Sequence, residues 1–157
     1  MAHTMDDGLG WYGSLGALPD PDTDPQFYDG VAARRLGAAF IDFVMVWGMA
    51  FLFVLMTLGI GIFMIGVFVL IADFLHRILT LTSRSATIGM RLMRIELRQR
   101  DGRQFDGAAA VTHTVLFYVL GLSMVLQLIS MVMMAGTRTG RGLHDLILGT
   151  AMINSPE

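Results

Sequence analysis

The chain has 157 residues, of which 54% are hydrophobic and only 15% are charged, and its mean hydropathy is +0.61. A soluble domain has roughly 45 to 50% apolar residues, so this composition indicates one integral membrane domain. The absence of cysteine excludes disulfides and thiolate metal sites. The net charge of −2 is distributed unevenly, because six aspartates and no basic residue lie in residues 1–33, and all eleven arginines follow.

The first 30 residues are rich in Gly, Pro and Asp and have almost no apolar periodicity. Such a segment cannot offset its chain entropy by burial, so we expect an acidic, disordered tail at 1–30 before a membrane domain at 31–154. It lacks the features of a cleaved secretory signal, and no leader is expected to be removed. The alternative is that aromatic side chains anchor this tail at lipid headgroups or on a partner protein. They are Trp11, Tyr12, Phe27 and Tyr28.

The apolar run from Gly37 to Leu75 contains only two charged residues, Asp42 and Asp73. About 20 apolar residues cross a bilayer as a helix, so this run is long enough for two spans. A glycine-rich break near residue 59 gives spans of about 36–57 and 60–79. The sequence therefore predicts a transmembrane helical hairpin.

Arginines lie at both ends of this hairpin. Arg34 and Arg35 precede the first span, and Arg77 and Arg84 lie near the end of the second. By the positive-inside rule, both ends and the N-terminus are expected on the cytoplasmic side of the membrane.

The segment that follows the hairpin, residues 82–107, has too many arginines to insert into a bilayer. We expect a helical first half and then a short strand, because Met93, Ile95 and Leu97 alternate with polar residues before the Asp101-Gly102 turn. An amphipathic surface helix is the alternative. Anionic lipid recognition by this basic segment is a further hypothesis beside ordinary positive-inside bias. Its arginines are Arg91, Arg94, Arg98, Arg100 and Arg103.

A third apolar region runs over residues 108–135 and has no charged residue. It is long enough for one tilted span, or it breaks at 121–123 into a short folded-back hairpin whose halves reach only about 21 Å each. The folded-back form is favoured, because it returns Arg138 and Arg141 to the side of the other arginines. The fold class is thus an all-α membrane protein with short β-prone cytoplasmic segments.

Intramembrane charges are the candidate functional groups. An aspartate at mid-bilayer costs about 2.5 to 3.5 kcal/mol on insertion scales, so it is usually paired, protonated or functional. Matching the two spans in depth places Asp42 in one layer with Asp73, His76 and Arg77, and Arg35 lies two helical turns before Asp42. This cluster is interpreted either as ion pairs that lock two helices, as a proton or cation site, or as a contact with another subunit.

Other candidate sites are weaker. His113 is expected to hydrogen-bond to the neighbouring backbone, and no histidine spacing indicates a zinc site. The chain has no P-loop, no GxSxG, no HExxH and no dinucleotide fingerprint. We therefore expect no enzyme activity, no cofactor, no metal and no nucleic-acid partner.

Three pieces, RRLGAAFID, SATIGMRLMRIELRQRDGR and RGLHDLILGTAMI, resemble in order and spacing the RDD family of small bacterial membrane proteins over residues 31–154. The resemblance implies that Arg35, Asp42 and Asp145 are the family residues, with Arg34 as a substitute for the first. The chain departs from the family at Met90, where a lysine is frequent, and in its short third apolar region.

The resemblance implies a multi-pass protein of the bacterial cytoplasmic (inner) membrane, with transport as the suggested activity. Our first hypothesis is that the chain contributes to ion or small-solute transport with Asp42 as the titratable site, and as an oligomer, because so few helices cannot enclose a pathway. The alternative is a non-catalytic accessory subunit of a larger membrane complex. The β-prone pieces RIEL and TAMI can pair only if both lie on the cytoplasmic side, which would bring Asp145 to the face of the Asp42 cluster. Its expected partners are Arg91, Arg94, Arg138 and Arg141.

Overall fold

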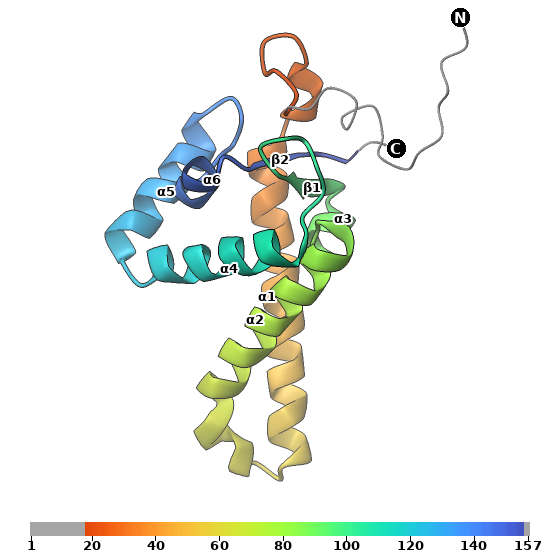
Figure 1. The fold of residues 1–157 in the computed structure, drawn as a ribbon. Helices are drawn as coiled ribbons and strands as arrows, with labels where there is room; N and C mark the ends of the chain where they lie inside the picture. Colours follow the sequence, from red (N-terminus) through yellow and green to blue (C-terminus); the bar gives the residue numbers. More distant parts are fainter. Residues whose placement is uncertain (1–17, 156–157) are drawn as a thin grey trace, which may run out of the picture.

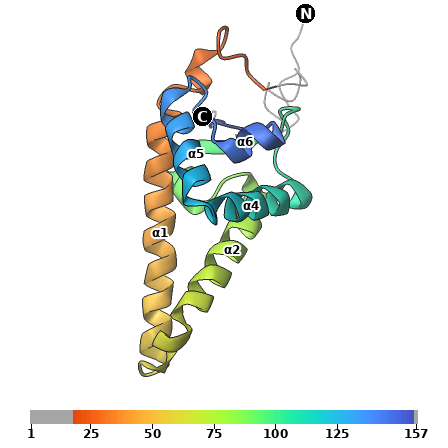
Figure 2. The same cartoon turned by 90° about the vertical axis from the view of Figure 1, so that its left-hand side faces the viewer.

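The computed structural model describes residues 18–155, and a hairpin of two long helices extends from the rest of the molecule (Figures 1 and 2). Helix α1 covers Val31–Met56, and α2 covers Ile65–Arg84 after a 3-10 segment at Ile60–Met64. The chain reverses at Leu58 and Gly59, whose φ angles are 52° and 89°. Both arms are long and apolar enough to cross a membrane, as the sequence predicts.

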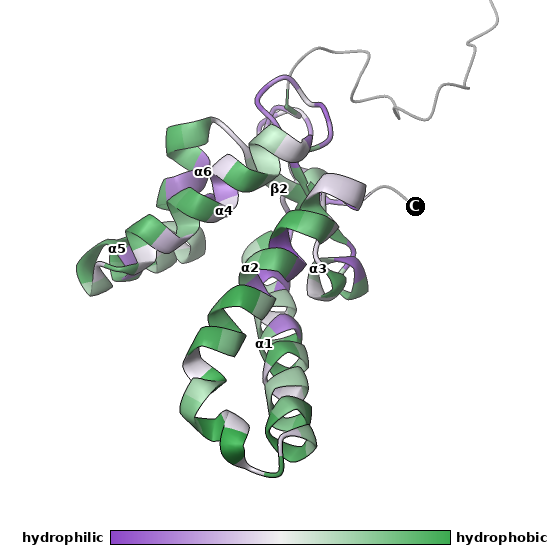
Figure 3. Cartoon of the chain, turned by 60° about the horizontal axis from the view of Figure 1, so that its bottom comes forward, coloured by the Kyte–Doolittle hydropathy of each residue, from purple (hydrophilic) through white to green (hydrophobic). Residues whose placement is uncertain are grey.

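The surface of the hairpin is apolar. At the turn, Met56, Leu58 and Phe63 are 79%, 92% and 84% exposed. Figure 3 shows hydrophobic colours along most of both arms and polar colours where α1 and α2 approach the rest of the chain. An exposed apolar surface of this extent marks a membrane or partner contact, so the free end of the hairpin is suited to lipid.

After α2, the chain forms a short helix and then a strand, in the predicted order. Ser85 ends α2 in the left-handed region with φ 55°, and Thr87 caps the N-terminus of α3 (Ile88–Leu92) by accepting a bond from the Met90 amide at 3.2 Å. Arg94 has φ 56°, and strand β1 (Ile95–Arg98) follows. Because a left-handed residue interrupts the helix, the alternative of one continuous amphipathic helix is wrong.

The third apolar region consists of two short helices bent by 117°. Asp106 caps α4 (Gly107–Gly121), and Ser123 caps α5 (Met124–Gly136). Figure 2 shows α4 running across the hairpin and α5 turning back from its end. At about 22 Å and 20 Å, neither half alone spans a hydrocarbon core of about 30 Å, so this region has the folded-back arrangement.

The strand that precedes α4 pairs in a two-stranded ladder with the strand near the C-terminus, after α5. Helix α6 (Leu143–Leu148) leads into strand β2 (Ala151–Asn154), which is antiparallel to β1, with Ile95 opposite Asn154. The segments before α4 and after α5 therefore lie on one side of the molecule.

The end of the acidic segment packs on this ladder. Residues 18–30 belong to the stretch expected as a disordered tail, but they form a turn and a 3-10 helix at Pro25–Phe27. Phe27 and Tyr28 are buried against Ala151 and Ile153, and the Tyr28 hydroxyl donates to the Pro19 carbonyl at 2.8 Å. These two aromatic side chains thus make contacts within the chain, which corrects both the disordered tail expected for this part and the alternative that they anchor it to a membrane or a partner. The other two, Trp11 and Tyr12, lie outside the described residues.

Helix α3 packs on α1 with the two backbones in close contact at Gly89 and Ala38. A Cβ atom added at Gly89 would lie 2.2 Å from the Ala38 carbonyl oxygen and 2.9 Å from Cγ of Asp42. Only glycine fits at this position, since the nearest obstacle is backbone and cannot rotate away.

We predict that Gly89→Ala destabilises the protein by about 2 to 3 kcal/mol through overpacking. The matched control is Gly66→Ala in α2, because a Cβ there meets nothing within 4 Å. Thermal unfolding of both variants in detergent checks this. Equal melting temperatures for the two variants would contradict the close approach.

Candidate functional site between the hairpin and the folded-back helices

A buried ion pair joins the start of α1 to α6. Nη2 of Arg35 lies 2.7 Å from Oδ2 of Asp145, and Nη1 of Arg35 donates to the Gly140 carbonyl at 2.8 Å. The Asp145 side chain has no exposed surface. The prediction that Arg91, Arg94, Arg138 or Arg141 pairs with Asp145 is therefore wrong. The partner is Arg35, which lies in α1.

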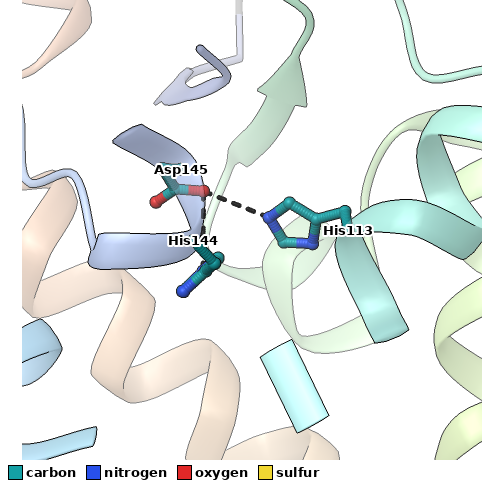
Figure 4. A group of neighbouring side chains, drawn as sticks. All are labelled: His113, His144 and Asp145. Atoms are coloured by element: carbon teal, nitrogen blue, oxygen red, sulfur yellow. Dashed lines mark hydrogen bonds and ion pairs between the residues drawn. The ribbon is translucent and has the colours of Figure 1, made fainter. Parts of the chain in front are cut away.

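Two histidines complete the surroundings of Asp145. His113 of α4 and His144 of α6 place Nε2 at 3.1 Å and 3.5 Å from Oδ1 of Asp145 (Figure 4). The Gly142 amide donates to Oδ2 at 3.0 Å, and the Thr150 hydroxyl donates to Oδ1 at 3.3 Å. His113 thus contacts a side chain rather than the neighbouring backbone expected from the sequence. This carboxylate therefore contacts side chains from α1, α4 and α6.

Asp42 makes a separate set of contacts with the segment before β1. Its Oδ2 accepts a bond from the Thr87 hydroxyl at 2.5 Å, and its Oδ1 accepts one from the Gly89 amide at 2.8 Å. Nε2 of His76 in α2 lies 3.4 Å from Oδ1. Asp42 is 3% exposed, and its partners are a hydroxyl, an amide and an imidazole.

The remaining pair predicted from the hairpin also forms. Nε of Arg77 lies 2.8 Å from Oδ2 of Asp73, one helical turn earlier in α2. The Tyr118 hydroxyl of α4 donates to the same carboxylate oxygen, and the Arg77 guanidinium lies over the Phe117 ring at 4.6 Å. The predicted layer is therefore present, but it divides into the pairs Asp42–His76 and Asp73–Arg77.

Some of these groups line one cavity of about 330 Å³ between α1 and the helices α4, α5 and α6, whereas Asp73, His76 and Asp145 are not among its lining residues. Its polar lining comes from Arg35, Asp42, Arg77, His113, Gln127 and His144. The remaining lining is mainly alanine and methionine, and it includes Met90. A small apolar cavity with a few convergent polar groups is the usual form of a ligand site, so this cavity is the candidate functional site.

The three aspartates of these contacts differ in their charged partners. Among the described residues, the carboxylates are Asp42, Asp73 and Asp145, and the guanidinium groups that pair with them are Arg35 and Arg77. Asp42 is the carboxylate without an arginine. A buried charge is costly without compensation, and around Asp42 the bonds from Thr87 and Gly89 and the contact with His76 take the place of a guanidinium.

The donor atoms of His113, His144 and Asp145 lie within 4.8 Å of one another. Two imidazoles and a carboxylate can bind a transition metal. Here, however, the Arg35 guanidinium already balances Asp145, and its Nη2 lies 3.5 Å from Nε2 of His144. A divalent ion in this cluster would face that positive charge, so the geometry favours a hydrogen-bonded cluster.

Four residues of these clusters were not singled out from the sequence, because they contact the aspartates only in the folded chain. Thr87, Gly89 and Tyr118 bind the predicted aspartates, and His144 binds Asp145. The adjacency of His144 to Asp145 in the LHD piece is the one local signal that could have indicated one of them.

We predict that Arg35→Met lowers the free energy of unfolding by about 3 to 5 kcal/mol, because it leaves Asp145 charged and unpaired in the interior. The control is Arg34→Met. Within residues 18–155, the Arg34 guanidinium bonds to Asn154 at the surface, and its loss should change stability by about 0.5 kcal/mol or less. Denaturation in detergent measures both. Similar losses in the two variants would contradict the burial of the pair.

Acid should destabilise the protein through His144. Burial lowers the pKa of His144 to about 4, with Asp145 opposing the shift and His113, Arg35 and Arg77 adding to it. Burial alone would raise the pKa of Asp145, but Arg35 and the His113 bond hold it below its usual range. Between about pH 6.5 and 4, the unfolded chain therefore binds a proton at His144 that the folded chain excludes, and stability falls as the pH falls.

We predict a loss of about 2 kcal/mol between pH 7 and 5 from this group. His144→Asn should flatten that part of the stability profile and leave the loss from Asp145 below about pH 4. Unfolding measured across pH checks both. A His144→Asn profile that falls as steeply as the wild type between pH 7 and 5 would contradict the assignment.

Comparison with protein-family models finds a match to the RDD family over residues 30–149. The match covers most of the chain and includes all three residues named above for the family pattern. Comparison with curated proteins and with solved structures finds no match in either set.

Proposed function

The chain belongs to the RDD family, and from that premise we propose that it contributes the Asp42–His76 pair to a membrane pathway for an ion or small solute, as an oligomer. Its place would be the bacterial cytoplasmic membrane, with the N-terminus and both hairpin ends on the cytoplasmic side. The arginines at the open end of the hairpin support this orientation. The observation that carries the proposal is that Asp42 lines the cavity and that, among the described residues, its ionisable partner is a histidine and not an arginine.

The depth of Asp42 suits such a role. Along α1, Arg35 lies about 33 Å from Thr57 and Asp42 about 22 Å from it. With the turn at the far boundary of a hydrocarbon core of about 30 Å, Arg35 lies at the near boundary and Asp42 about 8 Å inside it. A titratable carboxylate at this depth is reached from the near side through the cavity and not from the far side.

The chemistry of the pair supports exchange of a cation. Asp42 needs one positive charge nearby, and a proton on His76 or a cation in the cavity supplies the same compensation. When the charge arrives from the solution on one side, the fixed contacts of Asp42 to Thr87 and Gly89 remain in place. The pair can therefore change its charge state without a change of fold.

An oligomer is part of the proposal, because two spanning helices cannot enclose a pathway. Beyond Asp42 toward the turn, the arms of the hairpin are apolar and expose large side chains. The far half of a pathway therefore needs polar groups or packing from further copies. The accessory-subunit alternative has less support, since Phe27 and Tyr28 are buried against β2 instead of facing a partner.

Flux into vesicles tests the proposal. The full-length protein in liposomes should move protons or a monovalent cation, and His76→Gln should lower the rate at least about tenfold by removing the titratable partner. His76→Gln is preferred over Asp42→Asn as the first variant, because it leaves the two contacts of Asp42 to Thr87 and Gly89 intact. Asp42→Asn should abolish the flux if it folds.

Asp101→Asn is the matched control, because Asp101 is exposed and far along the chain in the turn after β1. It should leave flux unchanged. Flux equal in wild type, His76→Gln and a folded Asp42→Asn would refute the role of the pair, and capture of a stable larger complex with no flux would favour the accessory function instead.

A further inference from the structure

Three exposed arginines from consecutive segments of the chain line one groove of about 740 Å³. Arg84 is the last residue of α2, Arg91 lies in α3, and Arg94 lies at the bend before β1. The other lining residues are Ser83, Ala86, Ile95, Glu96, Gln104 and Ser155. The fold thus concentrates positive charge where α2 ends.

The acid that lines this groove, Glu96, is bonded to Arg98. Oε1 of Glu96 accepts two bonds from Arg98, at 2.9 Å and 2.5 Å, and Oε2 accepts one from Ser155 at 3.5 Å. Within residues 18–155, the Arg84 side chain has no hydrogen bond or ion pair, and Arg91 makes one long bond of 3.4 Å to the Ala86 carbonyl. Two guanidinium groups are therefore available to an anion.

The groove lies at the level of lipid headgroups. Arg84 is about 36 Å along the helical arm from Ile60, beyond the thickness of a hydrocarbon core of about 30 Å. Next to it, Ile88 and Leu92 lie one turn apart on α3 and are 38% and 64% exposed. A short helix with apolar side chains beside arginines is suited to the boundary between acyl chains and phosphates.

Other arginines of the basic segment lie outside this groove. Arg98 is held by Glu96 in the ladder, and Arg103 is ion-paired with Asp101 at 3.4 Å. Arg100 borders a different groove, whose lining includes Asp101 and Asp106. Arg84 and Arg91 in the groove therefore differ from Arg98 and Arg103, whose charges are compensated by acids.

We propose that Arg84 and Arg91 in this groove bind the phosphate of an anionic phospholipid headgroup, whose acyl chains lie against Ile88 and Leu92. Guanidinium groups bind phosphate oxygens in bidentate geometry, and basic pockets at the ends of spanning helices bind such headgroups. A lipid is favoured over free phosphate, because the apolar side chains next to the arginines have no role in binding a soluble anion.

The test uses the full-length protein in detergent, titrated with phosphatidylglycerol or phosphatidylcholine, with bound lipid counted by native mass spectrometry. The wild type should bind phosphatidylglycerol in preference to phosphatidylcholine. The double variant R84Q/R91Q should bind phosphatidylglycerol about tenfold to thirtyfold more weakly. The control R100Q/R103Q removes the same net charge from outside the groove and should bind like the wild type.

The variant R84K/R91K keeps the charge and should retain most of the binding, which separates a local contact from a folding defect. Equal binding of the two lipids by the wild type would overturn the proposal. Equal loss in R84Q/R91Q and R100Q/R103Q would overturn it in favour of general charge attraction. Displacement of the lipid by millimolar glycerol phosphate would overturn the choice of a lipid and point to a soluble phosphate.

Discussion

The ion pair between Arg35 and Asp145 is the constraint on which the rest of the structure depends. It joins residues 110 positions apart, at 2.7 Å and with no exposed surface on the carboxylate. The two side chains must stay in contact, because burying either charge without the other would strongly destabilise the fold. The pair links the first turns of α1 to α6, which packs on α4 and α5, and β2 after α6 pairs with β1.

Helix α1 makes a second attachment two turns further along. Asp42 binds the Thr87 hydroxyl and the Gly89 amide, and the missing side chain of Gly89 lets α3 approach the Ala38 carbonyl. One helix thus presents a cation to the C-terminal segment and an anion to the central segment. The three residues of the family pattern form two separate links along α1, and the cavity lies between them.

The two links differ in how far the charge of the aspartate is compensated by its neighbours. Asp145 has an arginine, two histidines, an amide and a hydroxyl around it, so its charge and its hydrogen-bonding capacity are filled. Asp42 is equally buried but has no arginine. This difference is why a structural role suits Asp145 and a change of charge state suits Asp42.

The hairpin, its break near residue 59 and the folded-back third region could be predicted, because length, hydropathy and arginine placement are local properties of the sequence. The layer of Asp42, Asp73, His76 and Arg77 followed from matching depths in a hairpin. The partner of Asp145 did not follow, since only the three-dimensional path of α6 brings it to Arg35. The burial of Phe27 and Tyr28 was missed for the same reason, as their partners lie in β2 at the other end of the chain.

Double-mutant cycles on Arg35 test this account most directly. Unfolding free energies are needed for Arg35→Met, Asp145→Leu and Asp42→Leu, and for the two double variants that contain Arg35→Met. The account predicts a coupling of about 2 kcal/mol or more between Arg35 and Asp145, and of about 0.5 kcal/mol or less between Arg35 and Asp42. A strong coupling of Arg35 to Asp42, with none to Asp145, would contradict it.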